Sequence, residues 1–184
     1  MPSAFSHAVA GLGIAACFCG PKAPKSLWAL GAVCAALPDV DVLGFQLGIR
    51  YGALWGHRGF THSIVFAAAL AGLITALILG LGFRHGVPGL PPWRLWLFLF
   101  LATISHGLLD MLTDGGLGVA LLAPFDNRRF FFPFQPIKVA SFGVAWLFTR
   151  HGAIVLASEL LWVWLPSAAL AAVAVLVRRT LGSS

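Results

Sequence analysis

An uncharged run from Ser63 to Phe83 constrains this chain more than any other feature. The run is 21 residues long and almost entirely apolar, and a helix of about 20 such residues crosses the hydrocarbon core of a bilayer. The rest of the chain agrees, because 59% of its 184 residues are hydrophobic and 10% are charged, whereas soluble domains carry about 25% charged residues. We therefore predict an integral membrane protein with a single domain over residues 1–184.

Four more apolar segments accompany this run, and most of their ends lie at glycine, proline or basic residues that stop a helix. They cover residues 7–19, 26–37, 93–109 and 152–177. The first is short for a full span, and the last is interrupted by Glu159 and Pro166. The predicted fold class is therefore all-α, a polytopic membrane helical bundle of about five hydrophobic helices.

The connections between these segments are of three kinds. Residues 42–56 are rich in glycine and predict an interfacial connection with about one turn of helix, whereas residues 84–92 predict a loop. Residues 114–150 combine glycine, proline, phenylalanine and basic side chains, so they are too polar to span and too apolar to float freely. We expect this long surface loop to lie across the membrane surface or over a site.

Three polar pieces interrupt the apolar pattern. They are residues 37–41 (Leu-Pro-Asp-Val-Asp), 54–63 (Leu-Trp-Gly-His-Arg-Gly-Phe-Thr-His-Ser) and 105–110 (Ser-His-Gly-Leu-Leu-Asp). In the last piece, His106 and Asp110 are four residues apart, so a helix places both on one face and lets them share a metal ion. Histidine and aspartate are ligand types for hard or borderline divalent metals.

The first two polar pieces add further candidate ligands. Asp39 and Asp41 alternate in a short segment after Pro38 that we expect to be non-helical, so one can point into a site while the other supports it. His57 and His62 precede a helix whose N-terminus favours anions. The full set of seven candidate ligands, enough for two metal ions, is His7, Asp39, Asp41, His57, His62, His106 and Asp110.

Alternation of the helices places every acidic residue on one membrane face. With the first helix running inward, that face carries Asp39, Asp41, Asp110, Asp114, Asp126 and Glu159, together with five of the six histidines. The acid-free face carries Lys22, Lys25, Arg84, Arg94, Arg178 and Arg179, as a cytoplasmic surface does under the positive-inside rule. Six Lys/Arg residues also lie on the site face, and we interpret them as serving the substrate or the loop. The site is then predicted on the extracytoplasmic side.

Three arginines near the candidate ligands, Arg58, Arg128 and Arg129, are candidates for phosphate binding. The planar guanidinium fork matches phosphate oxygens, and anchoring to lipid headgroups is the alternative. The net charge of +6 is scattered among apolar segments. We therefore expect the lipid bilayer and a phosphate-containing lipid or small substrate as partners, and no nucleic acid.

Two acidic residues are additional candidates for the site. Asp114 is followed by Gly115 and also fits a turn or a cap. Glu159 lies within an apolar helix, where burial of its charge predicts a partner such as a histidine, an arginine or a metal ion.

The polar pieces together resemble a known family. His7, Leu-Pro-Asp-Val-Asp at 37–41, His-Arg-Gly-Phe-Thr-His-Ser at 57–63 and His-Gly-Leu-Leu-Asp at 106–110 look like the YdjM-type family of bacterial membrane-bound, metal-dependent hydrolases. The match covers most of the chain. This resemblance implies a metal hydrolase at the bacterial inner membrane, with all seven candidate ligands as its polar set.

A more distant similarity is to zinc-dependent phospholipase C and P1-type nucleases. Their metal clusters draw on an N-terminal region, an aspartate, a histidine and a later His-x-x-x-Asp, an order that His7, Asp39 or Asp41, His57 and the His106–Asp110 pair would follow. No second His-x-x-x-Asp or His-x-x-x-Glu follows residue 110. One or two metal ions are therefore expected, and not three.

We predict from these features a membrane-embedded metal-dependent hydrolase that acts on a phosphoester, with a phospholipid as the candidate substrate. The predicted metal ligands are His7, Asp39, His57, His106 and Asp110, the catalytic residues are Asp41, Arg58 and His62, and the substrate-binding residues are Arg128 and Arg129. The cofactor is one or two Zn ions, with Mn or Mg as alternatives. The non-enzymatic alternative is a divalent-metal transporter or a lipid-binding membrane protein, although transporters hold ions near the bilayer midplane.

Overall fold

The computed structural model describes residues 1–20, 23–83, 85–87, 89–140 and 145–182. Its helices are α1 (Ala4–Phe18), α2 (Lys25–Ala36), α3 (Ile64–Gly80), α4 (Pro92–Met111), α5 (Arg150–Glu159) and α6 (Leu165–Thr180). Shorter elements are the 3-10 helices η1 (Leu37–Leu47), η2 (Phe60–His62) and η3 (Ala145–Phe148) and the π-helical turn η4 (Leu160–Trp164). The described residues contain isolated β-bridges but no extended strand, so the all-α prediction is confirmed.

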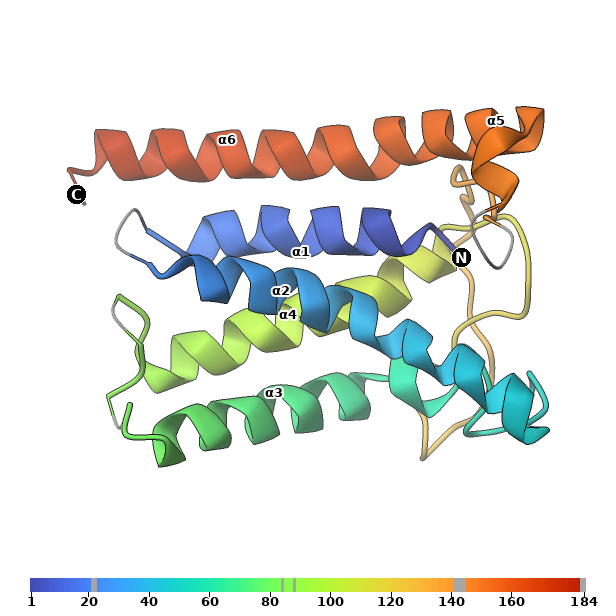
Figure 1. Cartoon of the computed structure of the whole chain (residues 1–184), viewed down its shortest axis with the longest axis horizontal. Helices are drawn as coiled ribbons and strands as arrows, with labels where there is room; N and C mark the ends of the chain where they lie inside the picture. Colours follow the sequence, from blue (N-terminus) through green and yellow to red (C-terminus); the bar gives the residue numbers. More distant parts are fainter. Residues whose placement is uncertain (21–22, 84, 88, 141–144, 183–184) are drawn as a thin grey trace.

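The long helices lie alongside one another, as Figure 1 shows. Helix α1 contacts α2, α4 and α6, and α3 packs against α4. The α1–α2 and α3–α4 connections and the end of α6 gather at one end of the bundle. The N-terminus and the two connecting segments, residues 37–62 and the described part of 112–149 (112–140 and 145–149), gather at the other end (Figure 1). All three polar pieces of the sequence therefore lie at the same end of the bundle.

Three helical stretches are long and apolar enough to cross a membrane: Lys25–Leu47, Pro92–Met111 and Arg150–Thr180. Helices α1 and α3 are apolar but shorter, with 15 and 17 residues. The long uncharged run thus forms a helix of about 26 Å at a rise of 1.5 Å per residue. Its start is fixed by Ser63, whose Oγ accepts the Phe66 N–H at 3.1 Å. Counting α5–η4–α6 as one, the five expected hydrophobic helices are present.

Two details differ from the sequence prediction, and proline explains both. The segment after Pro38 is not irregular, because the chain continues from α2 directly into η1. Proline lacks an N–H but is tolerated in a first helical turn, which is where Pro38 lies. Likewise Pro166 does not interrupt the last helix, because the π-helical turn η4 precedes it and α6 begins with Pro166 in its first turn.

The segment from residue 112 to residue 140 covers the end of the bundle that carries the polar pieces. It is bonded to the entry of α3, where the Ile64 N–H donates to Leu121 O at 3.0 Å and the Ala120 N–H donates to Arg58 O at 2.9 Å. Ile137 within it is fully buried. The long surface loop is therefore packed over this end and anchored by its own backbone.

Helices α1 and α2 approach closely where Gly11 faces Gly31. A Cβ atom added at Gly11 would lie 2.4 Å from the carbonyl oxygen of Gly31. Such contacts between small residues let membrane helices pack backbone against backbone. The separation of α1 from α2, and with it the position of His7 on α1, therefore depends on this glycine.

We expect Gly11→Ala to lower the thermal stability of the purified protein in detergent. The added methyl must push α1 from α2, and such overpacking costs about 1–3 kcal/mol. Gly80→Ala is the matched control, because Gly80 ends a helix and a Cβ there meets no atom within 4 Å. Equal melting temperatures for the two variants would contradict the close approach of α1 and α2.

Candidate metal centre

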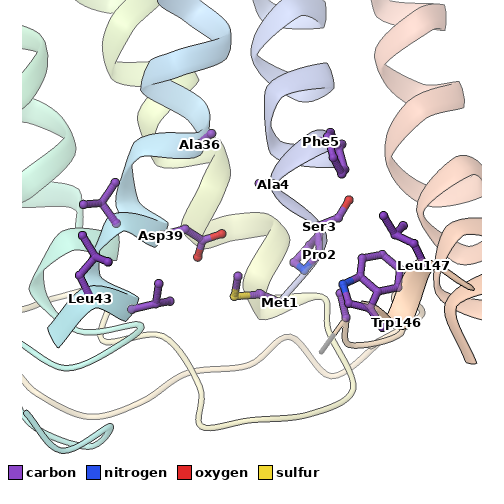
Figure 2. Close-up of a pocket in the computed structure, with 13 residues that line it drawn as sticks. Met1, Pro2, Ser3, Ala4, Phe5, Ala36, Asp39, Leu43, Trp146 and Leu147 are labelled. Atoms are coloured by element: carbon purple, nitrogen blue, oxygen red, sulfur yellow. The ribbon is translucent and has the colours of Figure 1, made fainter. Parts of the chain in front are cut away.

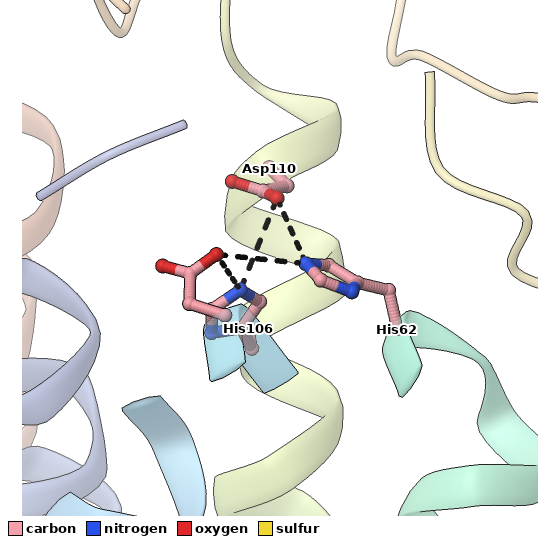
Figure 3. A group of neighbouring side chains, drawn as sticks. His62, His106 and Asp110 are labelled. Atoms are coloured by element: carbon pink, nitrogen blue, oxygen red, sulfur yellow. Dashed lines mark ion pairs between the residues drawn. The ribbon is translucent and has the colours of Figure 1, made fainter. Parts of the chain in front are cut away.

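Four side chains from three elements converge at this end of the bundle. Asp39 comes from η1, His62 from η2, and His106 and Asp110 from the last turns of α4. Each offers one ligand atom, and these four atoms all lie within 4.8 Å of one another. Figure 3 shows the two histidine rings and the Asp110 carboxylate directed toward a common point. We refer to Asp39, His62, His106 and Asp110 as the four-residue group.

The spacing of these atoms suits a single ion. The shorter separations are 3.2 Å from His106 Nε2 to Asp39 Oδ1 and 3.3 Å from His62 Nε2 to Asp110 Oδ2. The longer ones are 3.8 Å from His62 Nε2 to Asp39 Oδ1 and 3.9 Å from His106 Nε2 to Asp110 Oδ2. Four ligands bonded tetrahedrally to zinc at about 2.0–2.1 Å lie about 3.3 Å apart. The separations between the four ligand atoms are thus close to those expected around one bound zinc ion.

The same atoms lack hydrogen-bond partners among the described residues. They include Nε2 of both His62 and His106 and both carboxylate oxygens of Asp39 and of Asp110. All four residues are buried. Buried polar groups are almost always satisfied, because leaving one without a partner costs free energy. A cation at their common point would satisfy all four residues at once, so the donor set fits a metal ion.

The other ring nitrogen of each histidine is held by a partner outside the group. His106 Nδ1 lies 2.7 Å from the carbonyl oxygen of Ala35, so Nδ1 carries the proton and Nε2 is free to ligate. His62 Nδ1 lies 3.2 Å from Asp41 Oδ2. Histidine ligands of metals typically donate their second N–H to a carboxylate or a carbonyl in this way.

Asp41 is the centre of a second cluster, which shares His62 with the first. Its Oδ1 lies 2.7 Å from His57 Nδ1, and its Oδ2 accepts the Thr61 hydroxyl at 2.6 Å and the Arg58 N–H at 3.2 Å. Asp41, His57 and His62 could also hold an ion. Because these contacts already occupy the Asp41 oxygens, the carboxylate holds the 57–62 segment against η1.

Carboxylates favour positive charge on His62. Burial alone would lower the pKa of its ring, but the nearby carboxylates of Asp110, Asp39 and Asp41, 3.2–3.8 Å from its ring nitrogens, raise it to about 10. Opposite charges close to a buried group favour its charged form. The local field at the four-residue group therefore attracts a cation.

Two glycines allow the 57–62 segment to fold tightly. A Cβ at Gly59 would lie 2.2 Å from Leu54 O, and one at Gly56 would lie 2.2 Å from Arg50 O. Between them, Arg58 has a φ of 61° and is the only non-glycine residue with positive φ in the described ranges. Such backbone strain clusters at functional sites.

The Arg58 side chain is fully buried and bonded within the protein. Its Nε lies 3.1 Å from Asp110 Oδ2, at ion-pair distance but without hydrogen-bond geometry. Its terminal nitrogens donate to Gly115 O at 3.0 Å, Leu117 O at 3.2 Å and Thr113 Oγ1 at 3.0 Å. This arrangement fixes the guanidinium against Asp110 and links it to the covering loop.

Comparison with known proteins assigns this architecture to a family. The family model described as YdjM inner membrane protein matches residues 1–181. The chain belongs to the YdjM family. It is also 45% identical over 166 residues to the inner membrane protein YbcI of Escherichia coli (strain K12), which covers 90% of this chain and 92% of that protein. No solved structure matches significantly. An inner-membrane location is supported by both comparisons, and the resemblance seen in the polar pieces is confirmed.

Three of the five metal ligands predicted for this YdjM protein lie in the four-residue group: Asp39, His106 and Asp110. His62, predicted as catalytic, is the fourth member, and His57 lies instead in the second cluster with Asp41.

His7 lies beside the four-residue group. Its ring stacks on His106 with centroids 3.6 Å apart, and its Nε2 is 3.7 Å from Asp110 Oδ1. Both ring nitrogens are buried without a hydrogen-bond partner. His7 on α1 therefore packs against His106 and lies close to Asp110 without being a member of the group.

The two arginines predicted to bind substrate lie in the covering loop. Arg129 donates to four backbone carbonyls, those of Tyr51, Ala53, His57 and Gly118. Arg128 has a side chain that is 77% exposed and pairs with Asp126 at 2.6 Å. Arg129 thus ties the loop to the 51–57 segment, and only Arg128 presents its charge to the outside.

The two additional acidic candidates lie apart from the four-residue group. Asp114 pairs with Lys138 at 2.8 Å and accepts the Val139 N–H. Glu159 is fully buried and accepts the hydroxyls of Ser3 at 2.7 Å and Ser6 at 2.8 Å, as well as the Ser3 N–H. Its expected histidine, arginine or metal partner is thus replaced by serine hydroxyls, which satisfy the carboxylate and fix the start of α1 against the last helix.

Some residues that shape the site gave no signal in the sequence. The Ala35 carbonyl fixes the His106 ring, and Thr113 bonds Arg58. Gly107 is needed for space, because a Cβ there would lie 2.7 Å from His62 O. A glycine one residue after a candidate ligand was the one available hint that another segment lies against α4.

Proposed function

We propose that this YdjM protein is a metal-dependent hydrolase that acts on a phosphoester at the membrane interface. The observation that carries the proposal is the four-residue group, two histidines and two aspartates whose buried ligand atoms lie within 4.8 Å of one another and make no hydrogen bond within the described part of the chain. Membrane proteins bury ionisable groups at a high cost and keep them mainly for function. A purely structural role would leave these atoms hydrogen-bonded, as the Glu159 carboxylate is to Ser3 and Ser6.

The proposed metal ligands are Asp39, His62, His106 and Asp110, with His7 beside Asp110 as a further ligand. Two imidazoles and two carboxylates form a donor set that suits zinc, with manganese or magnesium as alternatives. One ion in the four-residue group is the simplest occupancy, and a second ion at Asp41, His57 and His62 would have to replace contacts that the Asp41 oxygens already make. A divalent ion bound there supplies a Lewis acid and lowers the pKa of water to near neutrality.

The chain's own residues divide the remaining work in this proposal. Asp41 fixes the ring orientation of His62 and leaves its Nε2 pointing into the group. Arg58 acts through Asp110, because its donors already engage Asp110, Thr113 and loop carbonyls. Both are positioning residues in this arrangement. Arg128 stays a candidate for contact with a phosphate from outside the group.

Activity assays with and without a chelator test the proposal. We expect detergent-solubilised protein to hydrolyse at least one member of a panel of phospholipids and phosphoester reporters. The chelator should abolish that activity and added zinc, manganese or magnesium should restore it, because the metal supplies the Lewis acid. Activity that survives the chelator would remove the metal mechanism. Inactivity on the whole panel, combined with metal flux into proteoliposomes, would establish the transporter alternative.

We further propose that the site faces the extracytoplasmic side. Lys25 begins α2 and Arg178 and Arg179 end α6, at the end of the bundle opposite the polar pieces (Figure 1). Basic residues flanking membrane spans favour the cytoplasm. Reporter fusions after Lys25 and after Arg179 should therefore both behave as cytoplasmic, and a periplasmic signal from either would reverse the orientation.

A further inference from the structure

A cavity of about 480 Å³ opens beside the four-residue group. It lies where the start of α1 faces η1 on one side and η3 on the other, as Figure 2 shows. Most of its lining is apolar and includes Phe5, Val42, Leu43, Trp146 and Leu147. The volume is within the range of about 300–1,000 Å³ that is typical of small-molecule sites. We call this space the Leu43 groove.

Asp39 connects the Leu43 groove to the four-residue group. It lines the groove and is the most exposed member of the group, at 8%, whereas His106 and Asp110 are completely buried. Figure 2 shows its carboxylate directed into the space between η1 and the first residues of α1. A molecule that reaches the candidate ligands through this groove therefore meets Asp39 first.

The rim of the Leu43 groove is apolar and faces outward. Phe5, Val40 and Leu43 line the groove and are each more than half exposed. Val40 and Leu43 belong to the Lys25–Leu47 stretch, which is long and apolar enough to cross a membrane. An exposed apolar rim on such a stretch is suited to contact with lipid chains, and this favours a groove that opens toward the hydrocarbon region of the bilayer.

We infer that the Leu43 groove binds one hydrocarbon chain of a phospholipid whose phosphate lies at the Asp39 side of the four-residue group. This inference rests on the proposed function and specifies its substrate class. The apolar Leu43 groove ends at the four-residue group, where the proposed metal ion would bind. These two parts match the apolar chain and the anionic head of a phospholipid. A soluble phosphoester would leave the groove without an occupant, and a protein segment would bring unpaired backbone groups into it.

A second cavity provides an internal control. It has a volume of about 420 Å³ and is lined by apolar residues of α1, α4 and the last helix, among them Leu108, Trp162 and Leu170. None of the four-residue group lines it. It can be filled by any chain of the bilayer, but it leads to no candidate ligand. Leu108 is exposed to 38% and Leu43 to 54%, so the two leucines are comparable sites for substitution.

The test uses a phosphatidylglycerol with a photoreactive group at the middle of one acyl chain, in vesicles that contain the full protein. We expect mass spectrometry to find adducts on Val42, Leu43 and Leu147. Leu43→Trp should lower this labelling at least about fivefold, because the indole occupies the space of the chain. Leu108→Trp should leave it unchanged. Leu147→Trp fills the same groove from η3 and replaces Leu43→Trp if that variant does not fold.

Labelling spread equally over both cavities, or labelling of the Leu43 groove that neither tryptophan reduces, would overturn the inference. Adducts that join the groove to a second copy of the chain would also overturn it and assign the surface to an oligomer. Labelling requires no turnover, so the two proposals can fail separately. A labelled groove without hydrolysis retains lipid binding and rejects the hydrolase, whereas chelator-sensitive hydrolysis with an unlabelled groove retains the hydrolase and rejects this substrate site.

Discussion

Asp110→Asn should prevent the proposed metal binding and abolish the proposed hydrolysis. The Asp110 carboxylate lies within reach of both histidines of the four-residue group, and its oxygens also face His7 and Arg58. An amide keeps the shape but loses the negative charge, and its nitrogen cannot ligate. Loss of an outer partner of a metal ligand already costs about 10- to 100-fold, so we expect loss of the ligand itself to cost at least about 100-fold.

Metal analysis and turnover should be measured together for this variant. Asp114→Asn is the matched control. Asp114 lies at the same end of the bundle, but its carboxylate contacts Lys138 and the Val139 N–H and not the four-residue group. It should retain metal and activity. A normal metal content in Asp110→Asn would contradict the proposed ligand set.

A second variant separates metal loss from misfolding. Asp110→Asn also leaves the buried Arg58 without its carboxylate, and breaking a buried ion pair destabilises a protein by about 3–5 kcal/mol. His106→Gln keeps the Asp110–Arg58 pair and removes only a neutral ligand. We expect His106→Gln to lose metal as Asp110→Asn does, but with a smaller fall in melting temperature. Equal metal loss at unequal stability would show that the lost ligand, and not misfolding, is the cause.

The sequence alone predicted the parts of the site that depend on local spacing. His106 and Asp110 are four residues apart in a segment whose length and apolar character predict a helix, and both lie in the four-residue group. The five hydrophobic segments were visible for the same reason, because each is a continuous stretch. The helices and the i, i+4 pair follow from properties of short stretches of chain.

Contacts between distant segments could not be predicted in this way. His57 and His62 both precede the same helix and both contact Asp41, yet only His62 also joins the four-residue group. The two rings point in different directions because Gly56 and Gly59 allow a tight turn in this segment. The partners of Glu159 are 153 and 156 residues away in the sequence, and only the packing of α1 against the last helix brings them together.

The segment after α2 shows that contacts at short range can also differ from the sequence prediction. The alternating aspartates after Pro38 led us to predict a short non-helical segment, whereas the chain forms a 3-10 helix. That helix has about three residues per turn, so positions two apart are separated by roughly 240° around its axis. Asp39 and Asp41 therefore still point in different directions, one into the four-residue group and one toward His57 and His62.

Asp41 is the residue that most directly fixes the orientation of the His57 and His62 rings. It contacts both rings of the second cluster, and its Oδ2 also accepts the Thr61 hydroxyl and the Arg58 N–H. It therefore sets the direction of His62 Nε2 without belonging to the four-residue group. A carboxylate that orients a histidine also makes its imidazole a stronger ligand.

Asp41→Asn should consequently lower metal affinity and hydrolysis by about 10- to 100-fold, the range for an outer partner of a histidine ligand, while the ion still binds at high metal concentration. The asparagine oxygen can keep one hydrogen bond, but its amide cannot accept from Thr61 and both histidines together. Titration of the chelator-stripped protein with zinc, followed by assays at saturating zinc, measures the two effects. Asp126→Asn serves as the control, because Asp126 is a loop carboxylate bonded to Arg128. Complete loss of binding at any zinc concentration would make Asp41 a direct ligand, and unchanged affinity would exclude it from the site.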